Sequence, residues 1–311
     1  MNPYTLVQRV GPDPQWGKGI HVLGLELGGR GLYLALLAVA LLSLTAPVAI
    51  RLGGEFRTRW ITWALILPVV GIPIWTGRTT TALLAAALAV GAVVEYVKLA
   101  ALRRSDSVWL LAWAVVLPLV TLISSSRATP EASGVAGAGA GAWVPWLVLG
   151  GAALPLLGSD RVDGFRRAAM LSFGIVWLCW SPANLPLLGR DAFPILFAAA
   201  CADVGAFVGG TTLRRFGWAA RGLTPLSPNK TWGGVLGGFI AATVVLFLCG
   251  ALSAGWVLAV WLGGIAGDLL ESMLKRQQQV KDAGDWLPGF GGLLDRIDSL
   301  LIAVPLAVLL A

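Results

Sequence analysis

Apolar residues fall into long runs that are separated by short polar loops along most of the chain. We count ten apolar segments, at about residues 31 to 50, 60 to 76, 80 to 100, 107 to 123, 143 to 158, 168 to 181, 191 to 213, 232 to 252, 254 to 271 and 298 to 311. A helix needs about 20 residues to cross about 30 Å of hydrocarbon, and several segments are shorter than this. The shortest could be re-entrant or partial spans, so the pattern predicts about eight to ten transmembrane helices.

The composition favours the same class of protein. Hydrophobic residues make up 57% of the chain and charged residues only 13%, and the mean hydropathy is +0.79. In lipid, backbone polar groups must pair with one another, and helices achieve this without closing a barrel. We therefore expect an all-α polytopic integral membrane protein.

The basic residues predict how the helices are oriented. If the N-terminus faces outward, most of the 23 Lys and Arg residues fall in the loops of one side, as the positive-inside rule requires of the cytoplasmic side. This distribution accounts for the net charge of +7 without a nucleic-acid partner. It also places the loop between the last two apolar segments in the cytoplasm.

The chain is expected to contain four regions. Residues 1–30 form an N-terminal surface segment, and residues 31–133 form the N-terminal transmembrane helices. The sequence GVAGAGAGA at residues 134–142 lacks large side chains and predicts a flexible linker. Residues 143–311 form a C-terminal transmembrane region, which holds most of the candidate chemistry.

Cysteine and histidine chemistry is disfavoured. The three cysteines, Cys179, Cys201 and Cys249, each lie inside an apolar run and show no metal-ligand spacing. The sole histidine, His21, precedes the first span. A histidine-based metal site or general base is therefore not expected.

The polar chemistry is concentrated at residues 272–299. This stretch contains Lys275, Arg276, Lys281, Asp282, Asp285, Asp295 and Asp298, together with Gly289, Gly291 and Gly292. Asp295 and Asp298 are three residues apart, so on a helix both carboxylates project from one face and can share a cation. Asp268 and Glu271 repeat that spacing just upstream. The basic side chains suit a polyphosphate, which glycine backbone can approach closely.

Three further stretches add polar groups. Asp203 is embedded among small residues of the seventh apolar segment, where an interhelical hydrogen bond is its simplest role. A role in the site is favoured, because this segment runs directly into the next polar loop. The loop after this segment offers Ser227, Asn229 and Lys230, for which contact with lipid head groups is the simplest role. Glu95 lies near the end of the third segment, where Lys98 could be its partner, and structural and functional roles are equally open.

The residue chemistry predicts a site that binds metal and phosphate at the cytoplasmic edge of the membrane. A solvated loop with incidental ion pairs would explain a random charge run, but here two acidic pairs, a basic cluster and three glycines share one short window. The pattern indicates Mg²⁺-dependent phosphoryl or nucleotidyl transfer on a lipid. It does not name the donor or the acceptor.

At these residues the sequence resembles the phosphatidate cytidylyltransferase (CDP-diacylglycerol synthase) family. The residues that fall in register with the family signature are Ser272, Lys275, Arg276, Lys281, Asp282, Pro288, Gly289, Gly291, Gly292, Asp295, Arg296 and Asp298. Two flanking stretches, DVGA from Asp203 and SPNKTWGG from Ser227, resemble the same family. Phe290 departs from the usual histidine, and Gly233 or Gly234 replaces the usual glutamate after Trp232.

The resemblance implies condensation of CTP with phosphatidic acid to give CDP-diacylglycerol and pyrophosphate. It implies catalytic roles for Asp268, Lys275, Arg276, Lys281, Asp295 and Asp298. It implies substrate or cofactor binding by Ser227, Asn229, Lys230, Asp282, Gly291, Gly292 and Arg296. Mg²⁺ would be held by Asp268, Asp295, Asp298 and Asp203, and a second cation is left open.

The expected setting is the bacterial cytoplasmic (inner) membrane, with the active site facing the cytoplasm. The partners are then CTP, phosphatidic acid and membrane lipids, with no nucleic acid, and a homodimer is left open. The alternatives are a paralogue that uses CTP on another lipid phosphate or lipid alcohol, and a non-catalytic homologue that binds lipid or nucleotide. A secondary transporter is disfavoured, because the polar residues crowd into one half of the chain.

Overall fold

The computed structural model describes residues 20–22, 25–27, 39–40, 43, 46–47, 54–127, 143–280, 284 and 291–311. The longer helices are α2 (Gly54–Thr76), α3 (Arg78–Leu99), α4 (Arg104–Arg127), α6 (Val144–Leu157), α7 (Gly164–Gly174), α10 (Ala192–Thr212), α11 (Trp232–Leu248), α12 (Ala254–Gln277) and α14 (Leu300–Leu309). The short ones are η3 (Ile175–Trp180), α8 (Ser181–Ala183), α9 (Leu185–Leu188), η4 (Gly189–Asp191), η5 (Leu213–Arg215) and α13 (Leu294–Ile297). The predicted linker and most of the first apolar segment lie outside these residues.

The helices fit an integral membrane protein. Within the described residues, four helical stretches are long and apolar enough to cross a bilayer, namely 78–99, 104–124, 164–215 and 254–277. Shorter apolar helices cover 64–76, 144–157 and 232–248. The 164–215 stretch contains the predicted segments 168–181 and 191–213, which the short helical turns from α8 to η4 connect.

The all-α prediction needs one correction, because two short antiparallel hairpins are present. Strands β1 (Ile20–Val22) and β2 (Leu25–Leu27) form one, and β3 (Gly222–Thr224) and β4 (Ser227–Thr231) form the other. In the second hairpin Thr224 pairs with Ser227 across a turn that contains Pro225. Proline presets the backbone for such a turn, and a two-stranded edge tolerates Pro228, which lacks an N–H donor.

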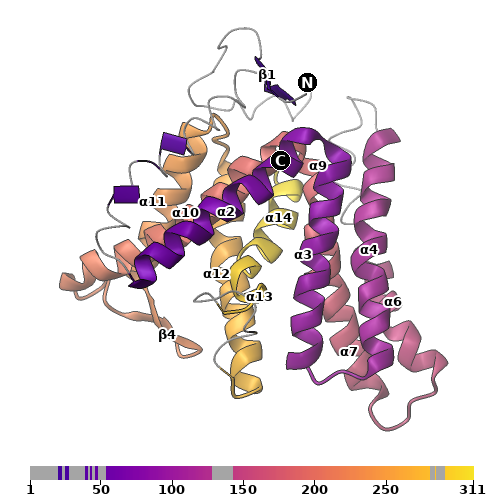
Figure 1. Cartoon of the computed structure of the whole chain (residues 1–311). Coiled ribbons are helices and arrows are strands. Elements are labelled where there is room, and N and C mark those ends of the chain that lie inside the picture. The colour runs from indigo at the N-terminus through magenta and orange to yellow at the C-terminus, as the bar shows by residue number, and fades with distance from the viewer. Residues whose placement is uncertain are drawn as a thin grey trace, which may run out of the picture.

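The helices form two groups that share α3 and α14. One core surrounds the buried Tyr96 and includes parts of α3, α4, η3 and α14. The other includes parts of α3, α10, α11, α12 and α14. Figure 1 shows α4, α6 and α7 on one side, α10 to α12 on the other, and α14 between them. The α3–α4 turn, the β4 hairpin and the C-terminal end of α12 lie at the lower end of this view.

Helices α10 and α11 pack with their backbones in contact. A Cβ at Gly237 would lie 2.9 Å from the Cα of Gly209 and would overlap the carbonyl oxygen of Gly205. A Cβ at Gly233 would lie 3.0 Å from the carbonyl oxygen of Gly209, and one at Gly234 would lie 2.9 Å from that of Ala206. The glycines thus permit a separation that no larger residue would allow.

Gly237→Ala is expected to destabilise the protein by about 1–3 kcal/mol, because the methyl group overpacks the α10–α11 contact. The measurement is the midpoint of thermal unfolding in detergent. Gly217→Ala is the control, since nothing lies within 4 Å of a Cβ at Gly217. Equal midpoints for the two variants would contradict this account of the contact.

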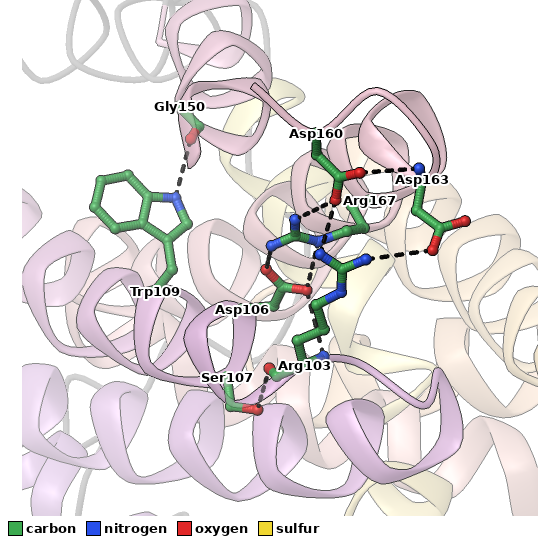
Figure 2. A network of polar contacts seen from close by, with 8 residues as sticks. All are labelled: Arg103, Asp106, Ser107, Trp109, Gly150, Asp160, Asp163 and Arg167. Carbon is green, nitrogen blue, oxygen red and sulfur yellow. Dashed lines mark hydrogen bonds and ion pairs between the residues drawn. The ribbon is translucent and has the colours of Figure 1, made fainter. Parts of the chain in front are cut away.

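A polar network ties the α3–α4 turn to the α6–α7 turn (Figure 2). Arg167 donates to the fully buried Asp106 from Nε at 3.0 Å and to Asp160 from Nη1 at 2.6 Å. Arg103 bridges Asp160 at 2.8 Å and Asp163 at 3.3 Å. The pKa of Asp160 is lowered to about 2, chiefly because the backbone N–H of Asp163 and the Arg167 guanidinium donate to its carboxylate. This carboxylate is therefore ionised at neutral pH.

Candidate active site

A cavity of about 780 Å³ lies between α10, α11, α12 and the β4 hairpin. Its charged lining residues are Asp203, Arg214, Lys230, Asp268, Glu271, Lys275, Asp295, Arg296 and Asp298. Neutral polar side chains, such as Ser227, and apolar side chains of the three helices, among them Phe207 and Trp261, line the remainder. The cavity therefore joins a charged region to an apolar region between helices.

Three carboxylates meet in this cavity. One oxygen each from Asp268, Glu271 and Asp298 lies within 4.8 Å of the others. Asp268 and Glu271 share one face of α12 because they are three residues apart, whereas Asp298 follows α13. The backbone of Asp298 can approach α12 this closely only because residue 267 is a glycine, since a Cβ there would overlap the carbonyl oxygen of Asp298.

The arrangement fits a hard divalent cation. Glu271 and Asp298 are only 1% and 6% exposed, and the Oε1 atom of Glu271 has no hydrogen-bond partner among the described residues. Like charges this close and this poorly solvated repel one another unless a cation or a proton intervenes. Carboxylate oxygens are the ligands that Mg²⁺ prefers in proteins.

Lys275 connects the cluster to the segment that follows it. Its Nζ lies 2.6 Å from Glu271 Oε2 and 2.7 Å from Asp295 Oδ1. The other oxygen of Asp295 accepts the backbone N–H of Gly292 at 2.8 Å. Asp295 thus pairs with Lys275 and stabilises the turn at Gly292. It is not among the three clustered carboxylates.

The β4 hairpin brings a second lysine to the cluster. Lys230 forms an ion pair with the Oδ2 atom of Asp268. The other oxygen of Asp268 accepts the Ser272 hydroxyl at 3.3 Å. Strand β4 ends at Thr231, whose hydroxyl accepts the N–H of Gly234 and caps α11. Extended backbone running into a capped helix therefore fixes where Lys230 lies.

Most of the predicted site residues meet in the cavity. Nine of them line it, namely Asp203, Ser227, Asn229, Lys230, Asp268, Lys275, Asp295, Arg296 and Asp298. Among the described residues, Arg276, Gly291 and Gly292 are not in the lining. Arg276 is exposed on the last turn of α12, and the two glycines belong to the turn before α13. Lys281, Asp282 and Phe290 lie outside the described residues.

The structure shows the contacts of two acidic residues whose roles the sequence left open. Glu271 joins the carboxylate cluster; its spacing from Asp268 indicates a shared face, but the metal ligands implied by the family resemblance did not include it. Glu95 is 1% exposed and accepts the backbone N–H groups of Leu293 and Leu294. Lys98 is exposed, and no ion pair joins it to Glu95 within the described residues. Nothing in the local sequence of α3 indicates this distant partner.

The chain is similar in sequence to known cytidylyltransferases. The model of the cytidylyltransferase family matches residues 57–311. A phosphatidate cytidylyltransferase of Brucella suis biovar 1 is 32% identical over 280 residues, which cover 82% of this chain and 93% of that protein.

Shorter and more similar matches occur as well. A phosphatidate cytidylyltransferase of Helicobacter pylori (strain ATCC 700392 / 26695) is 43% identical over 115 residues, and one of Haemophilus influenzae is 43% identical over 118 residues. These matches cover 34% and 33% of this chain, and 41% and 39% of those proteins. The chain thus aligns with less than half of the length of these two relatives and with nearly all of the Brucella relative. Since the family model covers most of the chain, the protein belongs to the cytidylyltransferase family.

Proposed function

We propose that this protein condenses CTP with phosphatidic acid to give CDP-diacylglycerol and pyrophosphate. The observation that carries the proposal is the meeting of Asp268, Glu271 and Asp298 with Lys230 and Lys275 in one cavity that continues between apolar helices. Such a cavity offers sites for a metal, for phosphates and for the apolar part of a lipid. The names of the relatives support the same reaction.

The reaction needs positioning more than proton transfer. An anionic oxygen of the lipid phosphate attacks the α-phosphorus of CTP, and the bond from that phosphorus to the oxygen that bridges to the β-phosphate breaks. The electron pair leaves with pyrophosphate. Because the nucleophile is already an anion, no strong general base is required, and the barrier lies in bringing anions together in line.

The clustered carboxylates would hold Mg²⁺, which would neutralise phosphate charge and stabilise the leaving pyrophosphate. Asp203 lines the same cavity and could contribute to a second cation site. Lys230 and Arg296 also line it and would bind phosphate oxygens. Lys275 would keep Glu271 and Asp295 in place through the two contacts described above.

The apolar part of the cavity suits a lipid acceptor. Phe207, Trp261 and Ile265 line it, and the indole N–H of Trp261 is held by the carbonyl oxygen of Val235 at 2.9 Å. A lipid phosphate could therefore reach the charged region while its glycerol and the start of its acyl chains remain among apolar side chains.

The membrane arrangement forms part of the proposal. The end of the molecule that bears the β4 hairpin and the α3–α4 turn would face the cytoplasm of a bacterial inner membrane (Figure 1). The basic residues of the loops support this orientation. We retain eight to ten spans, the division at residues 134–142, and a catalytic C-terminal region. CTP is available on the cytoplasmic side.

The test is turnover of CTP by the purified protein in detergent with phosphatidic acid and Mg²⁺. We expect CDP-diacylglycerol, identified by mass spectrometry, and one pyrophosphate for each molecule formed. A lipid alcohol is offered in a parallel reaction. CTP consumption with the alcohol alone would overturn the proposal, and so would the absence of product from every lipid.

A further inference from the structure

Glu95 is a buried carboxylate whose partners are far away in the sequence. Its Oε1 atom accepts the N–H of Leu293 at 2.8 Å, and its Oε2 atom accepts the N–H of Leu294 at 2.7 Å. The side chain is 1% exposed, so these two backbone donors replace the water that an ionised carboxylate otherwise needs. The contact connects the N-terminal half of the chain to its C-terminal part.

Two glycines make room for this carboxylate. A Cβ at Gly284 would lie 2.8 Å from Oε1 of Glu95, and a Cβ at Gly292 would lie 2.5 Å from Oε2. The backbone thus approaches Glu95 more closely than any residue with a side chain would allow. The site is fitted to a carboxylate, because both oxygens of Glu95 accept an N–H group.

The segment that Glu95 holds leads directly into the cavity. Asp295 follows Leu294 and binds both Lys275 and the N–H of Gly292. Lys275 in turn contacts Glu271, one of the three clustered carboxylates. Asp298 belongs to that cluster and lies four residues beyond Leu294. A displacement of Leu293 and Leu294 would therefore move Asp295 and Asp298 relative to α12.

We infer that Glu95 is a positioning residue for the metal site, fixing residues 292–298 so that Asp298 meets Asp268 and Glu271. It touches neither substrate nor metal, and it acts through the backbone of the turn. This inference rests on the proposed metal-dependent function. It assigns a role in the site to a helix of the N-terminal half, which contributes no residue to the lining of the cavity.

Glu95→Gln is the decisive variant. Glutamine retains one acceptor oxygen, but its amide group would place N–H donors against the second backbone N–H. Mutation of groups that orient metal ligands typically costs 10–100-fold in metal affinity. We therefore expect the dissociation constant for Mn²⁺, used in place of Mg²⁺, to rise by about 10–100-fold.

The measurement is titration of the full-length protein in detergent with Mn²⁺, following free Mn²⁺ by electron paramagnetic resonance. Asp106→Asn is the control, because it disturbs the buried ion pair with Arg167, which is not part of the cavity lining. We expect the control to lower the unfolding temperature and to leave Mn²⁺ affinity unchanged. The Mg²⁺ concentration for half-maximal turnover should rise in Glu95→Gln by the same factor as the Mn²⁺ dissociation constant.

The outcomes separate the inference from the proposed function. Unchanged Mn²⁺ affinity in Glu95→Gln, with normal binding by the parent protein, would overturn the inference alone. Absence of Mn²⁺ binding by the parent protein would overturn the proposed metal site and the inference together. If Glu95→Gln does not fold, Gly284→Ala perturbs the same carboxylate from the other side, and it must weaken Mn²⁺ binding for the inference to stand.

Discussion

Asp298→Asn is expected to reduce CDP-diacylglycerol formation by at least about 100-fold, because it removes one of three negative charges that would bind Mg²⁺. Asparagine has the shape of aspartate, and its amide oxygen can still accept the backbone N–H of Ser299, which lies 2.6 Å from Oδ1 of Asp298. The fold should therefore persist while the site loses its cation. The measurement is the initial rate at saturating CTP, together with the unfolding midpoint.

Asp163→Asn is the matched control for charge. Asp163 contacts Arg103 in the polar network, and its side chain is 45% exposed. We expect this variant to keep the parental rate, because surface ion pairs contribute about 0–1 kcal/mol to stability and the residue does not line the cavity. A rate for Asp298→Asn within a few-fold of this control would exclude Asp298 as a metal ligand.

Lys275→Met is expected to give the largest loss of stability, about 3–5 kcal/mol. Lys275 is the cation between Glu271 and Asp295, whose side chains are 1% and 9% exposed. Its removal would take from both buried carboxylates the ammonium group that contacts them, close to Asp298, while Asp295 would keep the N–H of Gly292. For a protein of this size the midpoint of thermal unfolding should fall by on the order of 10 °C.

Two further variants test the cause of this loss. Lys98→Met removes an exposed lysine from α3 and should leave the midpoint nearly unchanged. Lys275→Met combined with Glu271→Gln should recover much of the lost stability, since the second change neutralises the more buried of the two carboxylates. The account would be wrong if the double variant unfolded at a lower temperature than Lys275→Met alone.

Much of the C-terminal fold was predictable because membrane helices are encoded by composition over about 20 residues. The apolar segments at residues 232 to 252 and 254 to 271 correspond to α11 and α12, with ends shifted by a few residues. The β3–β4 hairpin was not predicted. Its strands are short and polar, and only Pro225 at the turn gave a signal.

The sequence predicted which residue types form the site, but it predicted less well which of their side chains contact one another. Asp268 and Asp298 were predicted to be metal ligands and both lie in the carboxylate cluster. Asp295 was favoured over Glu271 because its partner Lys275 is not visible in a linear pattern. Spacing on one helix assigns Asp268 and Glu271 to one face, whereas the route of the chain from α12 to α13 decides which carboxylate completes the cluster. Glu95 is the clearest example, since its two hydrogen-bond partners within the described part of the chain are backbone groups, which a sequence pattern does not reveal.

The glycine that replaces the family's usual glutamate after Trp232 has a physical explanation. Gly233 and Gly234 stand where the family usually has a glutamate, and both face the backbone of α10. A side chain at either position would push the two helices apart. The α10–α11 contact of this chain therefore excludes a glutamate at this place.

The hydrogen bonds of Glu95 also set an order of events during synthesis. Its partners lie 198 and 199 residues further along the chain. At about 5–20 residues per second, the ribosome needs roughly 10–40 s to reach them after it has made α3. During that interval an apolar helix carries an unpaired acid, which costs up to about 3.5 kcal/mol in the middle of a bilayer and less near its edge. A nascent chain that stops before residue 293 would lack these two hydrogen bonds, so we expect α3 to gain its full stability only after the turn before α13 has been made.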